Sequence, residues 1–347
     1  NASLYGTVYE ALNREDEIGT VYGMINGIEG FLNDQVMDMA PLEESKELEL
    51  IRTTPGSYLG SCRYKLPEDL NDPVYPQLFA RFEAYNIGYF FYIGGNDSMD
   101  TVSKLSRYAE KISSDIRVIG IPKTIDNDIN GTEMTFGFQS AIDIATRTLE
   151  ELHTTAKSHK RIIIDEIMGN KAGFLTLYSG IAGEADIILI PEIPYSIDKI
   201  VDFINKKLDE GRRHIIIAAA EGIISKDESK LTKKELKQKR TAENYTSAAV
   251  YLEKKLSEKI NREIRAVVPG HIQRGGNPCA YDKVLTSRLG AKGAELILNK
   301  EYGKMVAVVN NEISSVPLSV AVEKPKRVNT NDEIVKQVRM MGICLGD

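Results

Sequence analysis

The chain has 347 residues, 42% of them hydrophobic and 27% charged, which is typical of a globular protein with room for two domains. The formal net charge of -6 argues against a nucleic-acid-binding protein, because such proteins usually carry a basic surface. No apolar run approaches the roughly 20 residues of a membrane helix, and we expect no signal peptide. The cysteines at 62, 279 and 344 have no pairing or metal-ligand spacing, which predicts reduced thiols in the cytoplasm.

Short β-rich runs alternate with longer amphipathic segments along the chain. The runs with strand character are, in chain order, residues 19–24, 89–93, 117–121, 161–167, 185–190, 214–219, 265–268 and 305–309. Most of them are nearly continuous apolar runs, as expected for strands that helices cover on both faces. Between them, apolar residues such as Met99, Val102 and Leu105 recur at helical spacing. The alternation predicts a mostly parallel α/β architecture.

One stretch departs from this pattern. Residues 225–245 are dense in Lys, Glu and Gln and contain few apolar residues. Such a composition favours a solvated helical excursion or lid over a binding patch.

Two motifs follow neighbouring strand candidates. Gly94-Gly95-Asn96-Asp97-Ser98 supplies glycines that let backbone N–H groups approach an anion, and it then opens into a helix whose N-terminus favours negative charge. Pro122-Lys123-Thr124-Ile125-Asp126-Asn127-Asp128 supplies a cation and two carboxylates. Ligands of open α/β sheets lie outside the carboxyl ends of the strands. A phosphate cradle beside paired carboxylates indicates phosphoryl transfer.

Several common motifs are absent from the sequence. There is no GxxxxGK[ST], no GxGxxG with an acidic residue about 20 positions later, and no HExxH among the four histidines. These absences argue against a P-loop NTPase, an NAD-dependent Rossmann dehydrogenase and a metalloprotease.

The order of the motifs resembles the 6-phosphofructokinase family nearly from end to end. The landmarks are residues 60–63, 94–98, 122–128, 158–161, 168–169 and 191–192, then Glu221, Arg265 and the GHIQRGG block at 270–276. The resemblance implies a fold of two Rossmann-like three-layer α/β domains with an active-site cleft between them. It places residues 1–137 and about 275–304 in a phosphoryl-donor-binding domain. Residues 138–274 and about 305–347 would form a sugar-phosphate-binding domain.

The resemblance also implies catalytic roles. Asp126 would be the general base that takes the proton from the 1-hydroxyl of fructose 6-phosphate. Asp128 would orient this base or help to hold Mg²⁺, and Thr124 would bond the transferring phosphoryl group, with Lys123 beside it. A plain Asx turn or helix cap is the competing interpretation of this segment.

The family binds the 6-phosphate of fructose 6-phosphate with fixed cations. The matching residues here are Arg161, Arg265, His271 and Arg274, and arginine suits the task because its planar fork meets phosphate oxygens bidentately. Arg161 and Arg265 resemble the pair that the family donates from a neighbouring subunit, which implies a homodimer or homotetramer. The remaining sugar contacts implied by the resemblance are Met168, Gly169, Asn170 and Glu221.

The donor side of the resemblance comprises Arg63, Gly95, Asn96, Asp97, Ser98 and Lys123. Members that use ATP typically have glycine at the positions of Asp97 and Lys123. A carboxylate in the cradle would repel the α-phosphate of a nucleotide, and a lysine would add positive charge beside the transferring phosphate. We therefore expect pyrophosphate as the donor, in a reversible glycolytic reaction that gives fructose 1,6-bisphosphate, with ATP as the alternative.

Three features depart from the family pattern. Asn96 stands where an aspartate usually binds Mg²⁺, so the metal is expected to rely on Asp128, the donor phosphates and the Asn96 amide. Asn170 stands where an arginine often follows Met-Gly, although Lys171 is adjacent. The first residues resemble the helix that follows the amino-terminal strand and glycine-rich donor loop of the family, so we expect that strand and loop to be missing from this sequence.

Two other classes remain open. One is a catalytically weak homologue that binds sugar phosphates as a regulatory subunit, although the carboxylates Asp126 and Asp128 argue against it. The other is a lipid or nucleoside kinase with a similar glycine-rich cradle. Such a kinase would have no use for the cation set formed by Arg161, Arg265, His271 and Arg274.

Overall fold

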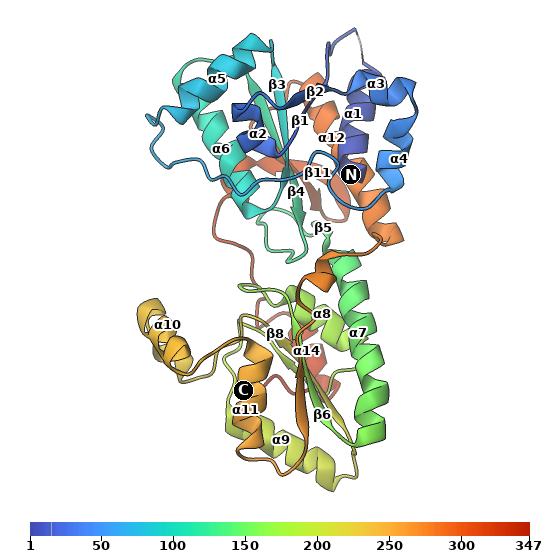
Figure 1. Cartoon of the computed structure of the whole chain (residues 1–347), viewed down its shortest axis with the longest axis vertical. Coiled ribbons are helices and arrows are strands. Elements are labelled where there is room, and N and C mark those ends of the chain that lie inside the picture. Colours follow the sequence, from blue (N-terminus) through green and yellow to red (C-terminus); the bar gives the residue numbers. More distant parts are fainter. Residues whose placement is uncertain (15) are drawn as a thin grey trace. The chain divides into compact units, whose positions relative to one another are not determined.

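The computed structural model describes residues 1–14 and 16–347, and these residues form two compact units (Figure 1). Unit 1 consists of Asn1–Thr124, Ile129–Gly137 and Asn277–Pro325. Unit 2 consists of Ile125–Asp128, Phe138–Gly276 and Lys326–Asp347. No helix in the described part of the chain is long and apolar enough to span a membrane.

The main sheet of unit 1 has the strand order β11-β10-β4-β3, and β5 pairs with the carboxyl-terminal end of β4. Strands β3, β4 and β10 are parallel to one another, whereas β11 is antiparallel to β10. The strands of this unit are β1 (Tyr22–Met24), β2 (Val36–Asp38), β3 (Tyr89–Gly94), β4 (Arg117–Thr124), β5 (Phe136–Gly137), β10 (Lys304–Val309) and β11 (Glu312–Pro317). Its helices are α1 (Ala2–Leu12), α2 (Gly27–Leu32), α3 (Ala40–Glu44), α4 (Glu47–Thr53), α5 (Val74–Ala84), α6 (Asn96–Lys111), α12 (Ala280–Leu298) and α13 (Leu318–Ala321).

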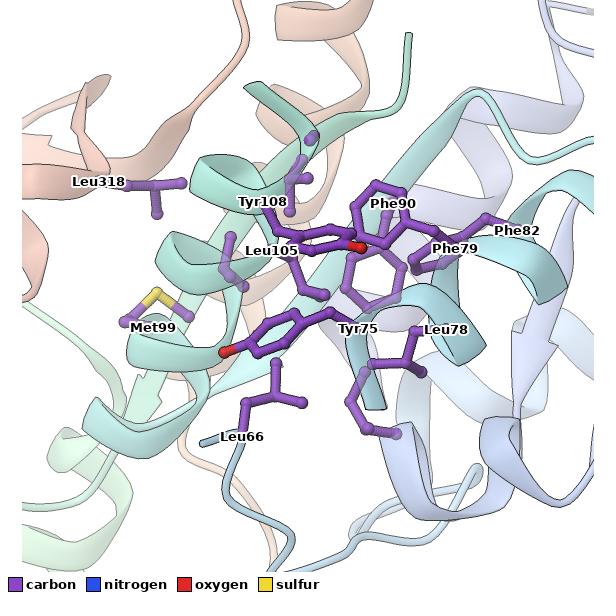
Figure 2. Packing of buried hydrophobic residues seen from close by; sticks show 14 of the residues in the cluster. Leu66, Tyr75, Leu78, Phe79, Phe82, Phe90, Met99, Leu105, Tyr108 and Leu318 are labelled. Carbon is purple, nitrogen blue, oxygen red and sulfur yellow. The ribbon is translucent and has the colours of Figure 1, made fainter. Parts of the chain in front are cut away.

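Alternating residues of β4 pack into different apolar clusters on the two faces of the main sheet of unit 1. Val118 packs into a cluster with α5 and α6, whereas Ile119 and Ile121 pack into another cluster with α12. Figure 2 shows the first cluster, where aromatic rings of α5 and α6 lie beside Phe90 of β3. The rings of Tyr75 and Tyr108 stack with their centroids 5.0 Å apart. Helices therefore cover both faces of the sheet, as the apolar strand runs predict.

Unit 2 contains a parallel sheet of order β7-β8-β6-β9. Its strands are β6 (Ile162–Ile167), β7 (Ile187–Leu189), β8 (Ile215–Ala220) and β9 (Ile264–Val267). Its helices are α7 (Phe138–His159), α8 (Phe174–Ala182), α9 (Ile197–Asp209), α10 (Lys233–Ala242), α11 (Ala248–Ser257) and α14 (Glu333–Met340), with 3-10 helices η1 (Glu228–Lys230) and η2 (Gly270–Arg274). Helices α9 and α11 pack on the face of β6 that carries Ile162 and Ile164. The predicted mostly parallel α/β fold is confirmed.

The strand at residues 305–309 lies in a different unit from the one expected. Strand β10 pairs with β4, with Met305 opposite Gly120, and unit 1 extends to Pro325. The reason is packing on both faces of the strand: Met305 is buried in the cluster with α5 and α6, and Val306 and Val308 are buried in the cluster with α12. An apolar run predicts a strand, but it carries no information about the sheet in which that strand is placed.

Candidate active site

The loop between β3 and α6 has the geometry of an anion cradle. Gly95 is the N-cap of α6, so the first N–H groups of a 16-residue helix follow directly after it. Gly94 permits a tight turn, since a β-carbon there would lie 2.0 Å from Oγ of Ser98. Asn96 and Asp97 begin the helix. The structure therefore places the four predicted donor residues 95–98 together at one helix N-terminus.

Asp97 is paired with a cation. Its Oδ1 lies 2.8 Å from Nζ of Lys65, and its side chain is 71% exposed. Lys104 attaches the segment around Lys65 to α6, because its Nζ donates to the carbonyl of Leu66 at 3.0 Å and to the carboxylate of Glu68 at 2.6 Å. Lys65, which lies outside the cradle motif, thus partly neutralises the charge of Asp97.

The end of β4 lies beside the cradle. Gly94 is in register with Pro122, and a β-carbon on Gly95 would lie 3.5 Å from the carbonyl oxygen of Lys123. Thr124 is the last residue of β4, and its carbonyl accepts a hydrogen bond of 2.8 Å from the hydroxyl of Thr135. The parallel pairing of β3 and β4 therefore brings the two sequence motifs together at the carboxyl edge of the sheet.

The segment after Thr124 makes a sharp turn. Asn127 has a φ of 51°, a left-handed conformation that asparagine tolerates better than most residues. Asp126 is half-buried and Asp128 is buried, and the carbonyl of Asp128 accepts a hydrogen bond of 2.8 Å from the N–H of Lys326. The turn therefore contains the carboxylates of Asp126 and Asp128, which are two positions apart in the sequence.

The donor set around this turn fits Mg²⁺ bound through substrate. No group of three or more His, Cys, Asp or Glu side chains in the described part of the chain could hold a metal ion. Mg²⁺ is usually bound through one or two carboxylates together with substrate phosphates, rather than by an all-protein cage. The carboxylate of Asp128 is the group of this segment that suits such a role.

In unit 2, three strand ends bring predicted sugar-binding residues to one edge of the sheet. Met168 and Gly169 follow β6, Glu221 follows β8, and η2 with His271 and Arg274 follows β9. The N–H of Gly169 donates to Oε1 of Glu221 at 3.4 Å. Because the strands are parallel, their carboxyl ends meet at this edge, where ligands of α/β sheets bind.

Gln273 holds two of these loops together, and nothing in the sequence distinguishes it from its neighbours in the GHIQRGG block. Its side chain is 1% exposed. Its Oε1 accepts from the N–H of Met168 at 2.9 Å, and its Nε2 donates to the carbonyl of Glu166 at 3.0 Å. The exposed His271 and Arg274 on either side of it are thereby positioned relative to the end of β6.

Arg161 and Arg265 lie at the opposite edge of the same sheet. Arg161 precedes β6, and Arg265 pairs with Ile163 near the start of that strand. Both bind Glu263, whose carboxylate lies 2.7 Å from Nε of Arg161 and 2.6 Å from Nη2 of Arg265. A strand rises about 3.3 Å per residue, so the length of β6 separates these arginines from Met168 by about 20 Å. Within one chain, the four predicted phosphate-binding residues form two separate pairs.

Asp165, in the middle of β6, is a buried acid that the sequence reasoning did not identify. It is 1% exposed, and neither carboxylate oxygen has a hydrogen-bond partner among the described residues. Burial, and secondarily the neighbouring Glu166, raises the pKa of Asp165 to about 8. Glu166 has a partner, since its Oε2 accepts from the N–H of Ala249 at 2.8 Å. Asp165 is thus protonated at neutral pH.

Comparison with known proteins gives similarity over nearly the whole chain. The phosphofructokinase family model matches residues 1–297. ATP-dependent 6-phosphofructokinase 3 of Bacteroides thetaiotaomicron is 35% identical over 100% of this chain and 96% of the relative. ATP-dependent 6-phosphofructokinase 2 of Clostridium perfringens is 41% identical over 74% of this chain and 68% of the relative. The crystal structure of pyrophosphate-dependent phosphofructokinase from Marinobacter aquaeolei is 27% identical, covers 100% of this chain and 88% of that chain, and has a TM-score of 0.81.

The expectation of pyrophosphate as the donor is wrong. Curated relatives that are 32–41% identical to this chain are named ATP-dependent 6-phosphofructokinases, whereas the similar structure of a pyrophosphate-dependent enzyme is 27% identical. The expectation treated Asp97 as an uncompensated negative charge in the cradle. The carboxylate is instead paired with Lys65 at 2.8 Å, so repulsion of a nucleotide phosphate is weakened.

Proposed function

Because the chain belongs to the phosphofructokinase family, we propose that it transfers the terminal phosphoryl group of ATP to the 1-hydroxyl of fructose 6-phosphate. The choice of ATP as the donor rests on one observation. Relatives that are 35% identical over most of their length are named ATP-dependent enzymes. The cradle at the start of α6 supports it, since a helix N-terminus suits the phosphates of a nucleotide. The three cysteines are free thiols, which supports the expected cytoplasmic location.

In this reaction Asp126 takes the proton from the attacking hydroxyl as it approaches phosphorus. A carboxylate can act as this base once the hydroxyl is held in line. Thr124 binds the transferring phosphoryl group, and Lys123 stabilises the negative charge that develops on its oxygens. Asp128, with the Asn96 amide as a further candidate ligand, would hold Mg²⁺ together with the donor phosphates, and the ion would supply positive charge to neutralise those phosphates.

On the donor side, we propose that the N–H groups at Gly95 and Asp97 bind phosphate oxygens, as an anion at a helix N-terminus does. The side chain of Ser98 lies against Gly94 in the cradle. Arg63 is exposed in the segment that Lys104 attaches to α6, and it adds a cation there.

The sugar phosphate binds at the carboxyl edge of the unit 2 sheet. Glu221 accepts from a sugar hydroxyl, the Met168–Gly169 loop lines the sugar with Asn170, and His271 and Arg274 bind the 6-phosphate. Arg161 and Arg265 lie about one strand length from these groups, since β6 rises about 3.3 Å per residue. We therefore propose a homo-oligomer in which Arg161 and Arg265 of a second copy complete the phosphate site.

A donor comparison on the purified chain tests the proposal. Formation of fructose 1,6-bisphosphate is followed through coupling enzymes, with fructose 6-phosphate and Mg²⁺ constant and the donor varied. We expect efficient turnover with ATP and much slower turnover with inorganic pyrophosphate. Binding of fructose 6-phosphate without turnover by any donor would instead identify a regulatory homologue, and no binding would overturn the assignment.

A further inference from the structure

Unit 2 has a cavity of about 880 Å³, open to solvent, between α10 and the loop that follows β6. This volume is within the range of small-molecule binding sites. Among the described residues that line it, Asn170 is the one member of the proposed sugar site, so most of the cavity lies outside that site. All of the described lining residues except Leu236 have polar side chains, and Lys233, Lys237 and Arg240 are its cations.

The lining is cationic. Lys233 and Lys237 are four residues apart on α10, so their side chains extend from the same face of the helix, and like charges at this spacing destabilise a helix. Neither lysine forms an ion pair with any residue that the structure describes, in contrast to Lys230 and Arg240 nearby. The described lining residues include no acidic side chain. The two lysines of the lining are thus cations without an ion-pair partner among the residues that the structure describes.

Arg240 has a different role from the two lysines. Its Nε lies 3.0 Å from Oε1 of the buried Glu228, its Nη2 donates to the carbonyl of Ile223 at 3.0 Å, and its guanidinium lies 4.2 Å from the ring centroid of Tyr245. These contacts anchor the carboxyl-terminal end of α10. The charge of Arg240 is therefore largely balanced, and the excess positive charge in the cavity comes from Lys233 and Lys237.

Core packing does not account for α10. The helix has no buried residue, although a complete capping box of Thr232 and Glu235 fixes its start. In Figure 1 it extends away from the sheet of unit 2. It carries five cationic residues and one acidic residue within a chain whose net charge is -6. A helix that is capped, anchored and cationic, but not part of the core, forms a suitable wall for an anion site.

We propose that the α10 cavity binds a phosphorylated small molecule, whose phosphate is held by Lys233 and Lys237. Ammonium groups bind phosphate as point charges, and the amide of Asn170 and the hydroxyl of Thr246 supply hydrogen bonds to the rest of the ligand. Asn170 follows Met168 and Gly169 directly, so a ligand in the cavity contacts the loop of the proposed sugar site. None of the residues proposed above to bind the donor or to take part in phosphoryl transfer lines this cavity.

Lysine reactivity in the full chain tests the site directly. The chain is acetylated at its lysines with a limiting reagent, and the modification of each lysine is read by peptide mass spectrometry. The probes are ADP and ribose 5-phosphate, with sodium sulfate at equal ionic strength as the control. We expect ADP, ribose 5-phosphate or both to slow the modification of Lys233 and Lys237, but not of Lys234 or Lys254, which do not line the cavity. No slowing at Lys233 and Lys237 by either probe, equal slowing at all four lysines, or slowing by sulfate to the same extent would overturn the proposal.

A matched pair of variants gives an independent test. Lys233→Ala with Lys237→Ala removes the two cavity charges, and Lys234→Ala with Lys254→Ala removes the same charge elsewhere. All four side chains are exposed, so both variants are expected to fold. The Tm increase produced by the protecting probe should be smaller in the first variant than in the second, since a ligand stabilises only through the sites it occupies. An equal Tm increase in the two variants would contradict the proposal.

Discussion

Asp165 illustrates how one buried side chain links the stability of this protein to pH. The pKa of its carboxyl group is about 8 in the folded chain, because of burial and the neighbouring Glu166, against an ordinary value of 3.8. Between these values the folded state keeps a proton that the unfolded state releases. The contribution of this group to stability is therefore fully present below pH 3.8 and is lost as the pH rises toward 8.

Replacing this carboxyl by an amide should remove the part of the pH dependence of stability that Asp165 causes. We expect Asp165→Asn to leave stability near pH 4 little changed and to make the chain more stable than wild type at pH 8, by several kcal/mol, since each unit of pKa shift corresponds to about 1.4 kcal/mol. Urea unfolding at several pH values measures this difference. Asp143→Asn, at an exposed position on α7, is the control and should follow the wild type. Parallel wild-type and Asp165→Asn profiles would exclude a titrating Asp165.

Asp126 is the residue on which the proposed chemistry depends most directly. Replacing it by Ser or Asn should lower the turnover number about 10²–10⁴-fold, which is the usual contribution of a general base. The KM for fructose 6-phosphate should change little, because a base acts mainly in the transition state. Steady-state kinetics with ATP measures both quantities. Near-normal turnover would remove Asp126 from the mechanism.

At the scale of elements, the 3-10 helix η2 is held to strand β6 by one side chain. Gln273 connects η2 to the N–H of Met168 and the carbonyl of Glu166, at 2.9 and 3.0 Å. Both bonds are buried, so the register between η2 and the end of β6 depends on an amide that can donate and accept at once.

Gln273→Leu should disturb this connection while keeping a side chain of similar volume. We expect a loss of about 1–3 kcal/mol in the free energy of unfolding, because two buried backbone groups lose their partner. The KM for fructose 6-phosphate should rise about tenfold or more with a smaller effect on turnover, since substrate positioning is affected more than chemistry. Urea unfolding and steady-state kinetics measure the two effects. A stability loss with an unchanged KM would show that Gln273 supports the fold alone.

At the scale of the whole molecule, the two halves of the proposed phosphate site lie at opposite edges of one sheet. Arg161 and Arg265 share Glu263 at the amino edge, whereas His271 and Arg274 follow the carboxyl edge. A single chain cannot bring the two pairs together, because β6 lies between them. Symmetric association of two copies can do so, since each copy then donates one edge to the other.

Mixing of two inactive variants tests this arrangement. Arg161→Ala and His271→Ala should each reduce activity strongly, and co-expression should restore about a quarter of wild-type activity, because half of the dimers are mixed and each has one intact site. The control pair is His271→Ala with Arg274→Ala, which removes the same half of the site in both chains and should restore nothing. Lack of restoration in mixed oligomers that do form would contradict the shared site.

The residue types of the candidate site, and the strand ends that carry them, were determined by the sequence alone. The loops after β3 and β4 depend on local properties, namely glycine at the start of a helix and two carboxylates in a turn with a left-handed asparagine. The alternation of apolar runs and amphipathic segments was likewise sufficient to predict the parallel α/β fold.

Other features were decided only by tertiary structure. The pair of Lys65 with Asp97, the bridge from Gln273 to Met168 and the joining of Arg161 to Arg265 through Glu263 all link segments far apart in sequence, by 105 residues for Gln273 and Met168. The placement of β10 in unit 1 is of the same kind. Periodicity and motif spacing describe interactions along a single segment. The charge around Asp97 and the partners of the buried groups depend instead on which distant segments pack together.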